Sequence, residues 1–150
     1  MEMSQLIIAR KDLNMSAGKL AAQVSHASMA FLTNIIRKNI CDISGVEPNQ
    51  VFAYVQFDKE TWDGWINGSF TKIVCEAKNK NQLLKVMDVA DSLGLVENRD
   101  YFLIRDNCYT ELEPEEYDEN EVGRTLTCIG FRPLPKDVNR QLSKKYQLYK

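Results

Sequence analysis

The sequence predicts one α/β domain in which helices cover both faces of a mixed β-sheet. Short apolar runs and segments of helical periodicity follow one another in the order strand, helix, strand, helix, strand, strand, helix. The chain has 150 residues, enough for one domain with a real core, and its 44% hydrophobic and 27% charged residues are ordinary for a globular protein. No internal repeat is visible.

The first predicted strand, loop and helix place a candidate site early in the chain. Residues 6–9 are apolar and suit a buried strand that ends at Arg10, and residues 11–17 form the loop after it. The helix is expected from about Gly18 to Lys38, with the Ser16 hydroxyl as its N-cap. In open α/β sheets ligands bind at the carboxyl ends of strands, and the start of a helix favours an anion through its N–H groups and its dipole.

Helical spacing divides the side chains of this helix between two stripes. One is apolar and is expected to face the core; it consists of Leu20, Val24, Ala27 and Phe31. The other runs beside it and carries a cation, an amide and an imidazole, from Lys19, Gln23 and His26. Spacing alone slightly favours a solvated edge with a structural histidine, although polar groups beside small alanines are also typical of a binding site.

The middle of the chain is predicted from turn signals and short apolar runs. Residues 39–50 are polar and indicate a loop, residues 51–57 alternate loosely and are interpreted as a strand, and residues 60–66 are interpreted as a short helix that packs Trp62 and Trp65. A strand is expected at 71–77, followed by a helix that begins at Asn79 and stops at Gly94.

The second half is expected to complete the sheet. Strands are predicted at 101–105 and 125–131. Proline residues then break the chain before a final helix at 136–148, whose buried stripe would be Val138, Leu142, Tyr146 and Tyr149.

Charge is unevenly distributed along the chain although the formal net charge is only −2. Residues 111–121 contain seven acids and no base, which is typical of a solvated or mobile loop. Residues 125–150 contain six bases and one acid, so this end could contact phosphates, with an ordinary surface helix nearly as good an interpretation.

Cysteine usage and hydropathy exclude some classes of protein. The four cysteines lie far apart without a CxxC motif, and there is a single histidine, so a zinc site is not expected. We interpret the cysteines as reduced thiols of a cytoplasmic protein. No apolar run approaches the ~18 residues of a membrane span, and the first ten residues do not resemble a secretory signal.

Several short motifs occur in a distinctive order. They are the apolar strand at 6–10, DLNM at 12–15, GKLAAQVSHA at 18–27, KIV at 72–74, LIRD at 103–106 followed by Thr110, TLTCIG at 125–130, and then a Pro-rich turn and a basic helix. On these motifs the chain resembles the type 2 peptidyl-tRNA hydrolase family over nearly its whole length. The GKxAAQxxHA run is specific for this family. The other motifs are weak alone and support the resemblance through their order.

The resemblance implies a fold, an activity and a set of site residues. The fold would be a three-layer α/β/α sandwich with a mixed, mostly four-stranded sheet, formed by residues 1–150 as one domain and usually dimeric. The activity would be hydrolysis of the ester between a peptide and the 3′ end of tRNA, without metal or organic cofactor. The matching catalytic positions are Lys19, Asp106, Thr110 and Thr125, and the substrate-binding candidates are Gln23, His26, Asn14 and Ser16.

A mechanism follows as a hypothesis from these residue types. Asp106 would act as the base or orient the water, and Lys19 would stabilise the developing oxyanion or a nearby phosphate. The two threonines would donate hydrogen bonds, and Gln23 would hold the peptide or the terminal adenosine. The plainer alternatives are that Asp106 caps a turn after its strand and that the threonines reflect only β propensity.

The chain also departs from the family pattern. Asn14 and Ala17 stand where the family commonly has lysines, and Cys108 and Tyr109 replace a glycine and an arginine. Segments near 40–58 and 111–122 look like insertions. Two other classes of function therefore stay open: an RNA-binding module without catalysis, and a protein-interaction domain that uses the acidic segment and the two tryptophans.

Overall fold

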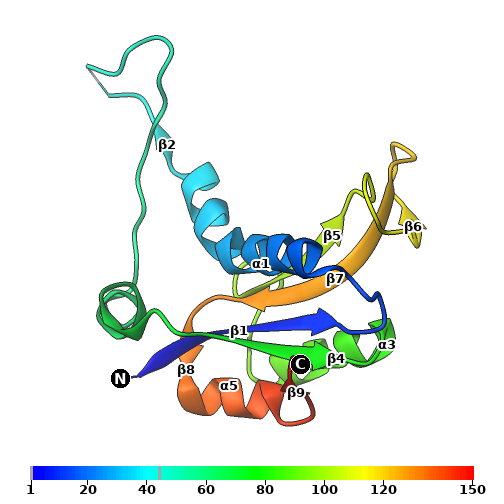
Figure 1. Cartoon of the computed structure of the whole chain (residues 1–150). Helices are drawn as coiled ribbons and strands as arrows, with labels where there is room; N and C mark the ends of the chain where they lie inside the picture. Colours follow the sequence, from blue (N-terminus) through cyan, green and yellow to red (C-terminus); the bar gives the residue numbers. More distant parts are fainter. Residues whose placement is uncertain (1, 44) are drawn as a thin grey trace.

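The computed structural model describes residues 2–43 and 45–150 and has a mixed seven-stranded sheet at its centre (Figure 1). The strand order is β5-β7-β1-β4-β9, with β6 paired to β7 and β8 paired to β1. The four long strands are β1 (Met3–Arg10), β4 (Lys72–Ala77), β5 (Tyr101–Asp106) and β7 (Gly123–Phe131). Strand β1 is parallel to β4 and antiparallel to β7, which confirms the predicted mixed sheet.

The expectation of a mostly four-stranded sheet is incomplete. Three strands of two residues each extend it: β6 (Glu116–Tyr117), β8 (Leu134–Pro135) and β9 (Gln147–Leu148). Such short strands form because a neighbouring edge offers unpaired backbone groups, and they carry no periodic pattern of their own in the sequence.

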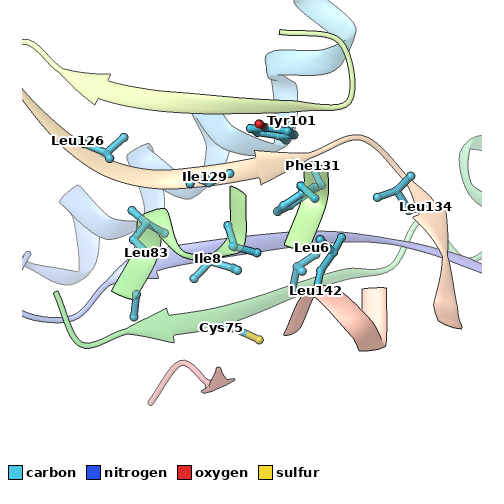
Figure 2. Close-up of a cluster of buried hydrophobic side chains, with 13 residues drawn as sticks. Leu6, Ile8, Cys75, Leu83, Tyr101, Leu126, Ile129, Phe131, Leu134 and Leu142 are labelled. Carbon is cyan, nitrogen blue, oxygen red and sulfur yellow. The ribbon is translucent and has the colours of Figure 1, made fainter. Parts of the chain in front are cut away.

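Strand β1 is buried along its whole length because helices contact both faces of the sheet. On one face, Ile7 and Ala9 pack with Ala27 of α1 (Ala17–Lys38). On the other face, Leu6 and Ile8 join a larger cluster with side chains from α3 (Lys80–Leu84), α4 (Val86–Ser92) and α5 (Lys136–Ser143), shown in Figure 2. The alternation of side chains along a strand thus divides the core between two helical coverings.

The contact between α1 and β7 is unusually close at Gly130. A Cβ atom built there would lie 2.3 Å from the carbonyl oxygen of Ala27. The glycine and the small alanine together let the helix backbone approach the strand. This packing holds the first turn of α1 in a defined position relative to β5 and β7.

The two tryptophans that were predicted to pack from a short helix, Trp62 and Trp65, have different environments. Helix α2 (Lys59–Thr61) continues into a π-helix, η1 (Trp62–Ser69), which is longer than the predicted 60–66 helix. Trp65 is buried edge-on against Phe31, with ring centroids 5.8 Å apart, and its indole N–H donates to the carbonyl of Thr71 at 2.8 Å. Trp62 is exposed beside Phe57, so only one of the two indoles belongs to the core.

The strand predicted at 51–57 is wrong in length and place. Only Phe52–Ala53 (β3) is a strand, and it pairs with β2 (Ile40–Cys41), within the predicted loop, in a separate two-stranded sheet. This hairpin projects away from the main sheet (Figure 1). Because it has no core to cover, its apolar side chains, including Val51, Phe52 and Tyr54, are exposed.

The helix predicted at 136–148 ends early, at Ser143. The residues after it are held by tertiary contacts: the Tyr146 hydroxyl donates to the carbonyl of Gln82 at 2.6 Å, and β9 pairs with β4. Of the predicted stripe, Leu142 is buried and Val138 and Tyr146 pack against the core, whereas Tyr149 reaches the sheet from beyond the helix. The 79–94 helix is confirmed as two consecutive helices, with Asn79 as N-cap and Gly94 in the left-handed region.

Candidate active site

The candidate residues gather at the edge of the sheet where β1, β4 and β5 end. Both β1 and β5 run antiparallel to β7, and β1 is parallel to β4, so the three carboxyl ends lie at one edge. Helix α1 begins at this edge, and the 107–122 segment starts there, as Figure 1 shows at the right of the molecule. The expected location, at the carboxyl ends of strands, is therefore the observed one.

Lys19 and Asp106 form an ion pair at the centre of this edge. The Lys19 ammonium nitrogen lies 2.8 Å from Oδ1 of Asp106, and the side chains are only 13% and 12% exposed. The same nitrogen donates to the hydroxyl of Thr110 at 3.2 Å. Three of the four predicted catalytic residues thus converge, from α1, the end of β5 and the loop after it.

The Asp106 carboxylate is held by two further donors. The backbone N–H of Cys108 donates to Oδ2 at 2.9 Å, and the side-chain amide of Gln23 donates to Oδ1 at 3.1 Å. Cys108 has a φ of +60°, which turns the chain so that its N–H points back to the carboxylate. Asp106 therefore does cap a turn, as the plainer alternative expected, and it also contacts Lys19.

The charge state of Asp106 follows from these contacts. Burial acts to raise the pKa of its carboxyl, but the hydrogen bonds from Lys19, Cys108 and Gln23 outweigh burial and hold the pKa below its ordinary value. Asp106 is consequently ionised throughout the neutral range. A carboxylate of low pKa is better suited to orienting a water molecule than to complete proton removal.

Gln23 is buried, with 1% of its surface exposed, and does not lie on a solvated stripe with Lys19 and His26. Its amide oxygen accepts a hydrogen bond from the Thr127 hydroxyl at 2.7 Å, while its amide nitrogen donates to Asp106. The side chain thus connects β7 to the carboxylate. Thr127 was not identified from the sequence, since nothing in its local pattern distinguishes it from neighbouring strand residues.

Thr125 lies directly across from Asp106 in the β5–β7 pairing, but its hydroxyl is engaged elsewhere. The hydroxyl donates to the carbonyl of Glu113 at 2.5 Å and accepts from the backbone N–H of Glu115 at 3.1 Å. The residue is fully buried. The hydroxyl also accepts from the thiol of Cys108 at 3.4 Å. The structure therefore places Thr125 beside the site, bonded to the acidic segment and to the turn that holds Asp106, and does not bring it to Lys19.

The remaining predicted residues lie on the exposed side of the loop and helix. Ser16 is the N-cap, accepting from the backbone N–H of Lys19 at 3.3 Å, as predicted. Asn14 is exposed in the left-handed region, with its amide donating to the carbonyl of Asp12 at 3.2 Å. His26 is also exposed and lies about 10 Å along the helix axis from Lys19, at 1.5 Å per residue.

Most residues of the acidic segment are exposed, as expected of a solvated loop, but the segment also contacts the site. The carboxylate of Glu111 accepts from the backbone N–H of Ser16 at 2.9 Å and from its hydroxyl at 2.6 Å. These two bonds hold the pKa of Glu111 below its ordinary value. An acidic side chain of the protein itself thus occupies the start of α1, where the sequence led us to expect an external anion.

Arg10, at the end of β1, also binds the acidic 111–121 segment. Its guanidinium is buried, forms a salt bridge with Glu115 and donates to both carboxylate oxygens of Asp12, at 3.1 and 2.9 Å. It also donates to the carbonyl of Leu126 at 3.0 Å. The signal missed in the sequence was a charged residue ending an otherwise apolar strand, since a buried arginine requires carboxylate partners.

The described residues contain neither a candidate metal centre nor a membrane-spanning helix. Within residues 2–43 and 45–150 no three His, Cys, Asp or Glu side chains are grouped so that they could hold a metal ion. No helix in the same ranges has both the length and the apolar character of a membrane span.

Comparison with known proteins shows the family of this chain. Residues 3–149 match the family described as "Peptidyl-tRNA hydrolase PTH2". The chain belongs to this family. Membership confirms the activity predicted from the sequence, peptidyl-tRNA hydrolysis.

Relatives in the family match over nearly the full length. The peptidyl-tRNA hydrolase of Haloquadratum walsbyi is 33% identical over 147 residues, covering 98% of this chain and 100% of that one. The Sulfolobus acidocaldarius enzyme is 32% identical over 136 residues, covering 91% of each chain, and the Thermoplasma acidophilum enzyme is 28% identical over 143 residues, covering 95% of each. The chain is therefore similar to these PTH2 enzymes as a whole and not only in its motifs.

Proposed function

We propose that this PTH2 protein hydrolyses the ester of peptidyl-tRNA at the Lys19–Asp106 pair, with Thr110 as a third member of the site. The observation that carries the assignment is the 2.8 Å contact between these two mostly buried charges, next to a threonine hydroxyl at the sheet edge. A buried ion pair is costly to desolvate, so its presence at the expected binding edge supports a chemical role.

The proposed reaction uses water as the nucleophile. Asp106 orients a water molecule and holds its proton only transiently, while the water oxygen bonds to the ester carbon. Lys19 and the Thr110 hydroxyl stabilise the negative charge that develops on the carbonyl oxygen. The bond between that carbon and the 3′ oxygen of the ribose then breaks, the proton passes to this oxygen, and free peptide and tRNA result.

Other residues have positioning roles in this proposal. Gln23 and the backbone of Cys108 fix the carboxylate of Asp106, and their hydrogen bonds to its two oxygens support this role. Thr125 supports the 113–115 segment beside the site. Exposed Asn14, Ser16 and His26 are proposed to contact substrate, because they follow the loop and helix next to Lys19. For Ser16 this contact displaces the carboxylate of Glu111.

We also propose the wider organisation that the family resemblance implies. The helices that contact both faces of the sheet support a three-layer α/β/α sandwich formed by one domain. Four free cysteines are compatible with a cytoplasmic location. The exposed apolar side chains on the β2–β3 hairpin support a homodimer, which sedimentation of the purified protein tests directly.

An assay of N-acetyl-aminoacyl-tRNA hydrolysis tests the assignment of the site. Asp106→Asn keeps the shape of the side chain and removes its charge, so turnover is expected to fall by about 10²–10⁴, the usual contribution of such a group. Asp63→Asn is the matched control, because Asp63 forms only an exposed pair with Lys59 on another part of the molecule.

Two outcomes would contradict the proposal. Unchanged turnover in Asp106→Asn would show that the carboxylate is not the acting group. Salt-dependent tRNA binding by the unmodified protein, without release of the acyl group under any condition, would instead favour the RNA-binding module without catalysis.

A further inference from the structure

Positive charge that is not paired within the protein gathers in a groove at the same sheet edge as the active site. Two hollows of about 250 Å³ each adjoin one another there and share Gln82 and Lys145 in their walls. They lie where β4 ends, between α3, α4 and the chain after α5. The acidic 111–121 segment pairs with β7 and reaches toward the groove, where Glu116 lies 3.9 Å from the ammonium of Lys80 at the start of α3.

Four lysines line this groove, and they come from three separate parts of the chain. Lys78 follows β4, Lys85 joins α3 to α4, and Lys144 and Lys145 follow α5. All four are exposed, and none forms an ion pair with a carboxylate in residues 2–43 or 45–150. By contrast, the cations nearer the active site are neutralised by carboxylates, as Lys19 is by Asp106 and Arg10 by Glu115.

The groove also contains neutral hydrogen-bonding groups. Gln82, Gln141 and Gln147 line it with side-chain amides, of which that of Gln82 accepts from the backbone N–H of Lys78 and donates to the carbonyl of Lys145. One carboxylate is present, that of Glu76, and it accepts a hydrogen bond from the backbone N–H of Lys150 at 3.3 Å. Lysine side chains with neighbouring amides are a set that suits phosphate and sugar oxygens of a nucleic acid.

The distance from the active site matches a short stretch of RNA. Asp106 ends β5 and Lys78 follows β4, and the order β5-β7-β1-β4 separates them by three strand spacings. At about 4.8 Å per spacing this is roughly 14 Å along the edge. In a stacked strand, where successive charges advance 3.4 Å along the helix axis, 14 Å corresponds to about four nucleotides.

We propose that this lysine groove binds the sugar–phosphate backbone of tRNA adjacent to its 3′ end and so sets the direction in which the substrate lies. The inference rests on the proposed function, because the 3′ ester must be at Asp106. The RNA then follows the sheet edge past β7 and β1 toward β4. Carboxylates of the 111–121 segment that lie along this path are neutralised within the protein, Glu115 by Arg10, and Glu116 by Arg105 and Lys80.

A charge-reversed variant tests the groove with two substrates. In Lys144→Glu/Lys145→Glu, two phosphate contacts are lost, which corresponds to about 30-fold weaker tRNA binding at about 0.15 M salt. We expect KM for N-acetyl-aminoacyl-tRNA to rise by at least this factor, with kcat little changed. Hydrolysis of the short substrate 3′-O-(N-acetylaminoacyl)adenosine should be unchanged, because it does not reach the groove.

Arg37→Glu/Lys38→Glu provides a control with the same change in net charge at the far end of α1. Fluorescence anisotropy across a salt series measures binding of deacylated tRNA independently of hydrolysis. The slope of log binding constant against log salt concentration should become less steep by about two in the groove variant only. The proposal is overturned if both double variants weaken tRNA binding equally, or if the short substrate is affected as strongly as tRNA. Absence of hydrolysis with a groove-dependent salt slope would count against the proposed reaction alone.

Discussion

At the scale of single residues, the Lys19 ammonium keeps a mostly buried carboxyl group ionised. Burial alone would raise the pKa of Asp106, and the donors around it reverse the sign of that effect. A group whose pKa is lower in the folded than in the unfolded protein stabilises the fold above its unfolded pKa, about 4 for aspartate. That stabilisation is lost as the pH falls through the folded-state pKa.

Replacing this lysine makes a pH-dependent prediction. In Lys19→Met the strongest donor is gone while burial remains, so the pKa of Asp106 should rise. The free energy of unfolding should be lower than in the wild type near pH 7, and the difference should shrink as the pH falls through the folded-state pKa of Asp106. Urea denaturation of both proteins across this range measures it.

Lys59→Met serves as the comparison, because Lys59 pairs with Asp63 at an exposed position where such pairs contribute little. A difference between wild type and Lys19→Met that stayed constant with pH would show that the two charges are not coupled.

The residues of the site were only partly predictable from the sequence. The meeting of Lys19, Asp106 and Thr110 was expected because they match ordered family motifs. The burial of Gln23 was not expected, because helical spacing gives only the direction of a side chain around the helix axis. It does not show which element packs against that face. Its partner Thr127 is 104 residues away in the chain.

At the scale of elements, the close approach of α1 to β7 positions Lys19 against Asp106. Gly130→Ala tests this contact, since the added methyl group would overlap the Ala27 carbonyl. Overpacking of this kind costs about 1–3 kcal/mol in free energy of unfolding, measured by urea denaturation. Because α1 must shift, hydrolysis should weaken as well.

Gly18→Ala is the informative counterpart. A Cβ at Gly18 meets nothing within 4 Å, and Gly18 lies in the first turn of α1. The substitution is expected to stabilise the protein by up to about 1 kcal/mol through helix propensity. Equal stability of Gly130→Ala and the wild type would show that the close contact between the α1 backbone and β7 is not required.

Elements were predictable where a local pattern coincided with the core. The four long strands and α1 are examples, because their apolar residues face one another across the sheet. The pattern at 51–57 was misleading, since β3 projects with β2 away from the core. The chain after Ser143 was misread as helix because pairing with the edge of β4 outweighed local helical preference.

At the scale of the whole molecule, the small net charge conceals a separation of charge along one edge. Glu111 and Glu115 contact the start of α1 and Arg10, while the lysines of the groove remain unpaired among the described residues. The sequence showed an acidic and a basic block, but Lys78 and Lys85 come from outside the basic block. Only the fold brings them beside Lys144 and Lys145.

The central claim is that Lys19 and Asp106 act together on the ester, and a double-mutant cycle tests it most directly. Single-turnover hydrolysis of N-acetyl-aminoacyl-tRNA would be measured for the wild type, Lys19→Met, Asp106→Asn and the double variant. We predict a large loss in each single variant and a loss in the double variant well below their product, because residues that act as a unit are not additive. Losses that multiply, or a wild-type rate in Asp106→Asn, would contradict the account.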